Sequence, residues 1–139
     1  ISGIATAIAY RSPQTSIFAV EPFGFEDTTL SLQQGSRVGN IEGAKSICDS
    51  LLASQPGELT FPINQKYLTG GIVVTDEEAK EAMRQAFYHF KLVLEPGGAV
   101  ALAAVIAKKF CCKNKTVCVI GSGGNVDPSF YRNVLKENY

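Results

Sequence analysis

The sequence predicts an α/β fold in which a mainly parallel sheet carries helices on both faces. Two observations predict this class. Short apolar runs of strand length alternate with segments of helical periodicity along the chain. The runs are nearly continuous, as in strands buried on both faces, and strands that alternate with helices imply right-handed crossovers. The 139 residues, 45% of them hydrophobic, suit one domain with a single core.

Local signals define the elements of the first half. Pro13 closes the first helix, because the residue before a proline avoids helical geometry. Asp27 is expected to cap the third element, and Gly35 to end it. The expected elements are a helix at 2–10, a strand at 16–20, a helix at 28–34 and a short helix near 44–52.

The second half carries the strongest helical pattern. Thr75 and Glu78 have the spacing of a capping box, and apolar residues then recur at helical intervals from Ala79 to Leu94. Pro96 suits a first helical turn, and Asp127 precedes Pro128 as a cap for the last helix. The expected elements are a strand at 71–74, a helix at 79–94, a helix through 99–107, a buried strand at 115–120 and a last helix.

Composition excludes several classes of protein. Thirteen basic residues balance thirteen acidic ones without forming a basic stripe, so nucleic acid is not an expected partner. The longest apolar run, 99–107, is shorter than the ~20 residues that a membrane span needs. Four cysteines show no CxxC spacing, and the single histidine, His89, completes no zinc set. A cytoplasmic or organellar-matrix location is expected.

The stretch "GSGGN", residues 121–125, follows the last predicted strand and is the first candidate site. It lacks the lysine of a phosphate loop, and Ser122 lacks the flanking glycines of a nucleophile elbow. A small hydroxyl beside glycines can meet a flat ligand and bond a neutral ring nitrogen. The alternative is a tight turn between strand and helix.

Two further candidates involve carboxylates. In the bend "EPFGFED", Glu21 and Asp27 can converge with backbone carbonyls on a hard cation. The alternative is that both are solvated turn residues, with Asp27 capping a helix. Glu95 precedes Pro96 at a helix start, where the helix dipole favours an anion, and its role is structural or catalytic.

Several stretches together resemble one family. They are "ISGIATAI", "AVEP", "PGELTFPIN", "TDEEAKEAMRQAF", "KLVLEPGGAVALAA" and "SGGNVDP". In one collinear order from Ile1 to about Phe130, they resemble the threonine dehydratase and serine racemase group of fold-type II pyridoxal-phosphate enzymes. The resemblance implies that residues 1–139 are the carboxyl-terminal segment of the large domain. The amino-terminal half, with its Schiff-base lysine and phosphate loop, and the small domain are then absent, so no catalytic residue is assigned.

The resemblance also implies roles for particular residues. Ser122 would bond the pyridine nitrogen of pyridoxal phosphate, Gly123 and Gly124 would shape that pocket, and Glu95 would lie near the ring. The other implied contacts are Glu21, the Phe25 carbonyl and Asp27 for Mg²⁺ or Ca²⁺, and Lys91 and Asn125 for a nucleotide. Ser50 replaces the glycine of many relatives, and the expectation is strain if that step needs a positive φ angle.

The function implied by the resemblance is that of a lyase of amino-acid metabolism. A threonine or serine dehydratase converts a hydroxy amino acid to a 2-oxo acid and ammonia by β-elimination, in isoleucine biosynthesis when threonine is the substrate. The implied partners are the missing amino-terminal half and further copies in a homo-oligomer. A serine racemase-like enzyme remains an alternative, as does a non-catalytic fragment or regulatory module that binds metal or contacts a subunit. Whether this chain alone is an enzyme stays open.

Overall fold

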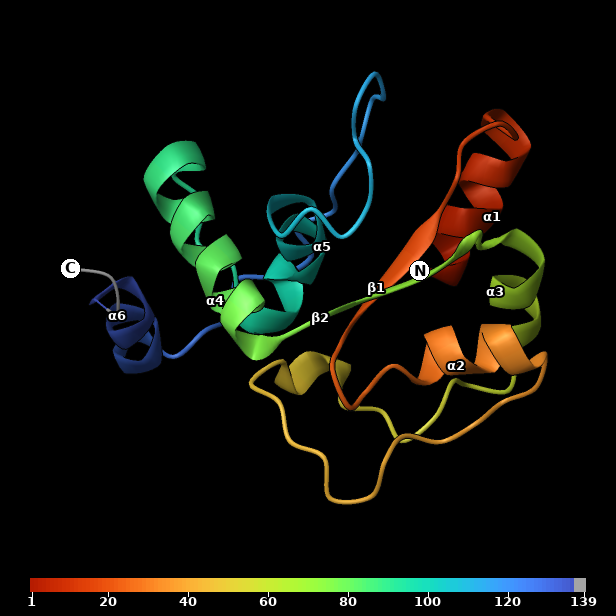
Figure 1. Cartoon of the computed structure of the whole chain (residues 1–139), viewed down its shortest axis with the longest axis horizontal. Helices are drawn as coiled ribbons and strands as arrows, with labels where there is room; N and C mark the ends of the chain where they lie inside the picture. Colours follow the sequence, from red (N-terminus) through yellow and green to blue (C-terminus); the bar gives the residue numbers. More distant parts are fainter. Residues whose placement is uncertain (137–139) are drawn as a thin grey trace.

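The computed structural model describes residues 1–136. Two strands and a set of short helices follow one another along this part of the chain (Figure 1). They are α1 (Ser2–Arg11), β1 (Phe18–Pro22), α2 (Asp27–Gln34), η1 (Asp49–Leu51), α3 (Phe61–Tyr67), β2 (Gly70–Val74), α4 (Asp76–Gln85), η2 (Ala86–Phe90), α5 (Pro96–Ile106) and α6 (Pro128–Lys136). Within residues 1–136, no helix combines the length and the apolar character needed to cross a membrane.

The two strands pair in parallel, and helices cover both faces of the sheet. Phe18 pairs with Gly70 and Pro22 with Val74. A side chain at Gly71 would enter α2, since its Cβ would lie 2.7 Å from the Cβ of Thr29. Ile72 and Val74 lie in or against the apolar cluster of α4 and α5. Because successive strand residues point to opposite faces, α2 lies against one face and α4 with α5 against the other, which confirms the predicted fold class.

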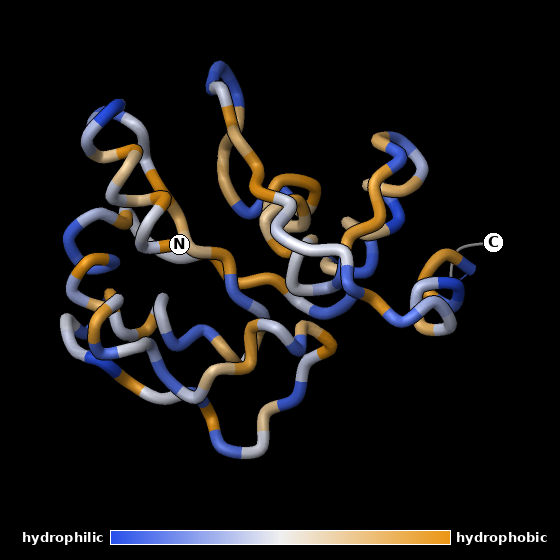
Figure 2. The backbone as a smooth tube through the Cα atoms, turned by 180° about the vertical axis from the view of Figure 1, so that it is seen from behind, coloured by the Kyte–Doolittle hydropathy of each residue, from blue (hydrophilic) through white to orange (hydrophobic). Residues whose placement is uncertain are grey.

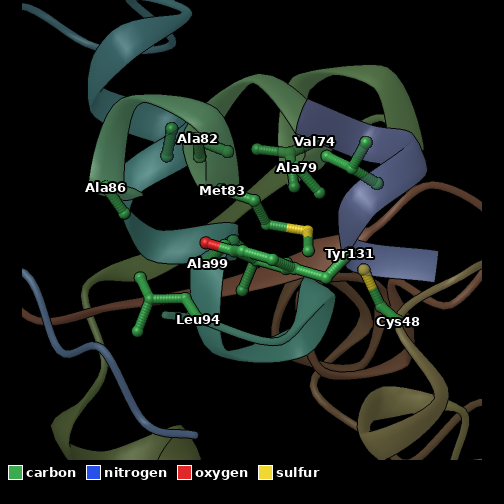
Figure 3. Packing of buried hydrophobic residues seen from close by; sticks show 13 residues of the cluster. Cys48, Val74, Ala79, Ala82, Met83, Ala86, Leu94, Ala99 and Tyr131 are labelled. Atoms are coloured by element: carbon green, nitrogen blue, oxygen red, sulfur yellow. The ribbon is translucent and has the colours of Figure 1, made fainter. Parts of the chain in front are cut away.

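The core lies between α4, α5 and α6. Met83 is fully buried there, and Tyr131 of α6 and Leu94 reach the same cluster (Figure 3). Most other members from α4 and α5 are alanines, so these two helices approach closely. Cys48 closes the cluster from the loop before η1, and burial raises the pKa of its thiol to about 11. This cysteine therefore belongs to the packing.

The capping box at the start of α4 is confirmed. The Thr75 hydroxyl accepts from the Glu78 amide at 3.2 Å, and the Glu78 carboxylate accepts from the Thr75 amide at 2.8 Å. Both groups satisfy amides that the first helical turn would leave without a partner.

Replacing Thr75 with alanine is expected to lower the free energy of unfolding by about 1 kcal/mol, because one of the two reciprocal bonds is lost. Urea denaturation of the protein that carries this chain measures the change. Thr75→Ser retains the hydroxyl and serves as the control, so a loss as large as that of the alanine variant would contradict the role of the bond.

The helix predicted over 79–94 is shorter in the structure. α4 ends at Gln85, the next five residues form a π-turn, and Lys91 adopts a left-handed conformation with φ 58°. The Leu92 amide then donates to the Ala86 carbonyl and closes the turn. The prediction of helix beyond Phe90 was wrong because Leu94 reaches the core from a loop, which mimics the apolar period of a helix.

Three other elements differ from the prediction. The expected helix near 44–52 is only the single turn η1, while α3 was missed although Pro62 in its first turn marks a helix start. Residues 115–120 are not a buried strand. They pair with no strand among the described residues and leave Val117 and Ile120 exposed. Figure 2 shows the hydrophobic legs of this excursion and its hydrophilic tip.

Candidate functional site

The Ser122 turn, residues 121–125, lies directly on the amino-terminal end of α5. The Glu95 amide donates to the Gly123 carbonyl at 3.0 Å. In return, the Asn125 amide donates to the Glu95 carboxylate at 2.8 Å. These two bonds join segments about 30 positions apart in the sequence and fix the turn against the helix start.

Glycines allow this close approach. A Cβ at Gly98 would lie 2.8 Å from the Gly123 nitrogen, and a Cβ at Gly123 would lie 2.8 Å from the Glu95 Cδ. A Cβ at Gly124 would meet the Val93 carbonyl oxygen at 2.6 Å. Real Cβ contacts are almost never this short, so these positions admit only glycine unless the backbone moves. The sequence analysis named Gly123 and Gly124 but missed Gly98, although a Pro-Gly-Gly run at a helix start was a usable signal.

Ser122 itself is exposed, and among the described residues its hydroxyl has no hydrogen-bond partner. The neighbouring backbone groups, by contrast, are engaged with Glu95. The turn therefore presents one unengaged hydroxyl on a fixed backbone. A serine hydroxyl can both donate and accept and carries no charge, so this donor set fits the uncharged ring nitrogen of a heterocyclic cofactor.

The expected strain at Ser50 is absent. The residues other than glycine with positive φ are Lys91, Lys108 and Asn114, so Ser50 keeps an ordinary backbone. Its hydroxyl instead fills the space where a side chain at Gly97 would lie. The turn η1 thus packs against α5 beside the Ser122 turn.

The acidic bend between β1 and α2 has a structural role. The Glu21 carboxylate, which belongs to a residue only 8% exposed, accepts from the Thr28 and Thr29 amides at 2.8 Å and from the Thr29 hydroxyl at 2.7 Å. Asp27 is the first residue of α2 and not its cap, and it is buried rather than solvated. The prediction of Asp27 as a cap was wrong because Glu21 of β1 takes over the free amides.

The bend does not form a cation site as it is arranged. Both Glu21 oxygens are engaged by α2, and Asp27 accepts from the Asn40 side chain at 2.9 Å. Within residues 1–136, no group of three or more acidic, histidine or cysteine side chains could hold a metal ion. The structure thus gives no support to the predicted site of Glu21, Phe25 and Asp27 for Mg²⁺ or Ca²⁺.

Burial raises the pKa of the Asp27 carboxyl, and repulsion from Glu21 adds to this, while the bond from Asn40 opposes it. The folded protein therefore binds a proton at Asp27 at a higher pH than the unfolded chain does. This contribution to stability is fully present below the unfolded pKa and is lost as the pH rises through the folded pKa.

The Asp27→Asn variant is expected to abolish that contribution. The difference in unfolding free energy between the native protein and the variant should shift towards the native protein as the pH falls towards 3.8, the ordinary pKa of an aspartate. Urea midpoints measured across a pH series give this difference. A difference that is constant over the series would contradict a raised pKa.

The two residues proposed for a nucleotide are not brought together. Lys91 donates from its ammonium to the Tyr88 carbonyl at 2.9 Å, whereas Asn125 bonds to Glu95 through its main chain. Between these residues and the acidic bend, the described residues form no hydrogen bond or ion pair. A shallow hollow of about 520 Å³ lies at the other end of α5, lined by Val105, Lys108, Phe110, Cys111, Cys112 and Lys113. It includes none of the predicted site residues.

Known proteins share this fold and sequence. Residues 1–123 match the family described as pyridoxal-phosphate dependent enzyme. The chain is 38% identical to the serine racemase of Dictyostelium discoideum over 138 residues, which are 97% of this chain and 42% of that protein. It is 31% identical to the L-threonine ammonia-lyase of Thermotoga maritima, covering 99% of this chain and 34% of that protein.

Solved structures agree. The threonine deaminase of the organism abbreviated T.th. superimposes with a TM-score of 0.83 at 34% identity, covering 91% of this chain and 42% of that one. Maize serine racemase gives a TM-score of 0.84 at 31% identity, covering 95% and 41%. The chain thus spans less than half the length of these relatives. Since the family match covers residues 1–123, the chain belongs to the pyridoxal-phosphate dependent enzymes, in the fold of threonine deaminase and serine racemase.

Proposed function

We propose that the chain is the carboxyl-terminal segment of the large domain of a pyridoxal-phosphate dependent threonine or serine dehydratase, an ammonia-lyase. The observation that carries the proposal is the Ser122 turn, fixed on α5 with its hydroxyl unengaged. Relatives named threonine dehydratase and L-threonine ammonia-lyase support the reaction class. The proposed context is amino-acid metabolism in the cytoplasm or an organellar matrix, with isoleucine biosynthesis following if threonine is the substrate.

In this proposal, the Ser122 hydroxyl holds the ring nitrogen of the cofactor. When bound, pyridoxal phosphate supplies an electron sink next to the α-carbon of an amino acid. A carboxylate beside the ring nitrogen would keep it protonated, whereas a serine hydroxyl leaves it neutral. The weaker electron sink favours loss of the β-hydroxyl over transamination. Gly123 and Gly124 keep the turn against α5, so that Ser122 stands at a defined point.

The remaining catalytic groups lie in the proposed amino-terminal half, which would supply the lysine, the phosphate loop and the small domain. The exposed apolar segment 115–120 supports this arrangement, because Val117 and Ile120 stand 38% and 49% exposed. A strand with this composition is stable when it has neighbours to pair with. We further propose that the assembled enzyme is a homo-oligomer.

The test is to purify the native protein that carries this chain and to incubate it with L-threonine or L-serine and pyridoxal phosphate. Release of 2-oxo acid and ammonia in equal amounts is expected, and the Ser122→Ala variant should reduce it. Ser129→Ala, in the exposed first turn of α6, is the matched control. If the cofactor binds and yet no 2-oxo acid forms from either amino acid, the proposed reaction is wrong.

A second candidate is a serine racemase-like activity, which the 38% identity to the Dictyostelium discoideum racemase favours. Both reactions start from the same amino acid, and the products separate them. Chiral chromatography of the same incubation detects D-serine. D-serine that accumulates faster than pyruvate would favour the racemase over the dehydratase.

A further inference from the structure

We propose that Glu95 is a positioning residue, which fixes the Ser122 turn as a hydrogen-bond acceptor and does not itself contact the cofactor. This inference rests on the proposed function only for what Ser122 binds. The resemblance placed Glu95 near the cofactor ring, but the contacts of the structure assign its carboxylate to the main chain of the turn.

The first support is the direction in which the side chain reaches. Glu95 is the N-cap residue of α5, where a side chain ordinarily accepts from the free amides of its own helix. It makes no such bond. The carboxylate crosses instead to the Asn125 amide, while the Glu95 amide donates to the Gly123 carbonyl. One residue therefore holds both sides of the turn that contains Ser122.

The second support is the packing of the carboxylate. A Cβ at Gly123 would lie 2.7 Å from the nearer Glu95 carboxylate oxygen and 3.0 Å from the other. Both oxygens thus lie against the residue that follows Ser122. Gly98 of α5 contacts Gly123 from the helix side. The Ser122 turn has little freedom to shift while these contacts hold.

The first measurement is amide hydrogen exchange at Asn125 in the native protein, which requires no cofactor. Glu95→Ala is expected to accelerate this exchange by about ten- to a hundredfold, since a bond to a charged acceptor is lost. Glu95→Gln keeps one acceptor oxygen and should accelerate it by less than about tenfold. Glu58→Ala, which removes an exposed carboxylate far from the turn in sequence, is the matched control and should leave the exchange unchanged.

Each result decides the matter. Exchange at Asn125 that is unchanged in Glu95→Ala would overturn the positioning role. Equal acceleration in the alanine and glutamine variants would show that the charge is required and would overturn the acceptor role. If Glu95→Ala does not fold, Glu95→Gln and Glu95→Asp still test the proposal, because Glu95→Asp keeps the charge and shortens the reach. Exchange as slow as in the native protein for Glu95→Asp, together with rapid exchange for Glu95→Gln, would also count against it.

The second measurement is the affinity for pyridoxal phosphate, followed by fluorescence titration of the native protein, the two single variants Ser122→Ala and Glu95→Ala, and the double variant. If Glu95 acts through Ser122, the double variant binds no more weakly than Ser122→Ala does. If the two losses multiply, Glu95 contacts the cofactor independently and the inference is wrong. If Ser122→Ala does not change the affinity, the proposed role of Ser122 fails, whereas the exchange result still decides the role of Glu95.

Discussion

The Gly98→Ala variant is expected to lose about 2 kcal/mol of unfolding free energy. The added methyl group would meet the main chain of Gly123, with the nitrogen at 2.8 Å and the carbonyl carbon at 3.1 Å. A main chain that is held by two bonds to Glu95 cannot move aside like a flexible side chain. Overpacking of this kind costs about 3 kcal/mol, and the better helix propensity of alanine offsets about 1 kcal/mol.

Gly3→Ala is the matched control for this substitution. Gly3 also lies within a helix, α1, but a Cβ there would have nothing within 4 Å. The control is expected to gain about 0.5–1 kcal/mol, since only the helix propensity changes. Urea midpoints at equal slope measure both variants. If both variants move in the same direction, the contact between α5 and the Ser122 turn is not what requires glycine at residue 98.

Elements with local signals could be predicted from the sequence. The capping box, Gly35 at the end of α2, and Asp127 before α6 each involve bonds within one turn of the chain. Such signals are visible in a short window of residues. Hence α1, α2, α5, α6 and the start of α4 were predicted to within a few residues.

Elements that depend on distant partners could not be predicted. Residues 44–48 looked helical, but Ser46 and Ile47 donate to Asp76, 29 or 30 positions away, and this holds the loop outside a helix. The segment 115–120 has the composition of a strand, yet a strand forms only where another strand pairs with it. Pairing is a property of the whole sheet, which the window of residues does not contain.

The same distinction applies to the candidate site. The types of residue in "GSGGN" excluded a phosphate loop and left an available hydroxyl, and the structure keeps Ser122 exposed on a fixed turn. The bond from Asn125 to Glu95 spans 30 positions and left no pattern in the sequence. For the acidic bend, the sequence indicated that carboxylates meet there. It could not indicate that the amides of α2 already engage Glu21.

The Glu21→Ala variant is expected to lose about 3 kcal/mol of unfolding free energy, the largest effect among these substitutions. The carboxylate satisfies two amides and one hydroxyl at the start of α2, and the N-cap residue Glu26 makes no side-chain bond that could replace it. Removing a buried acceptor leaves these donors without partners, which costs about 1–3 kcal/mol for each fully buried group. Thr28 is only partly buried, so the sum stays below the maximum.

The comparison of three variants isolates this capping role from a loss of charge alone. Glu42→Ala removes an exposed carboxylate and should change the unfolding free energy by less than about 0.5 kcal/mol. Glu21→Gln retains one acceptor oxygen but turns an amide group towards the α2 donors, so its loss should approach that of Glu21→Ala. Circular dichroism during urea denaturation measures all three. If adding Mg²⁺ or Ca²⁺ stabilised the native protein and not Glu21→Gln, Glu21 would be a metal ligand and not a helix cap, because α2 occupies the oxygens that a cation would need.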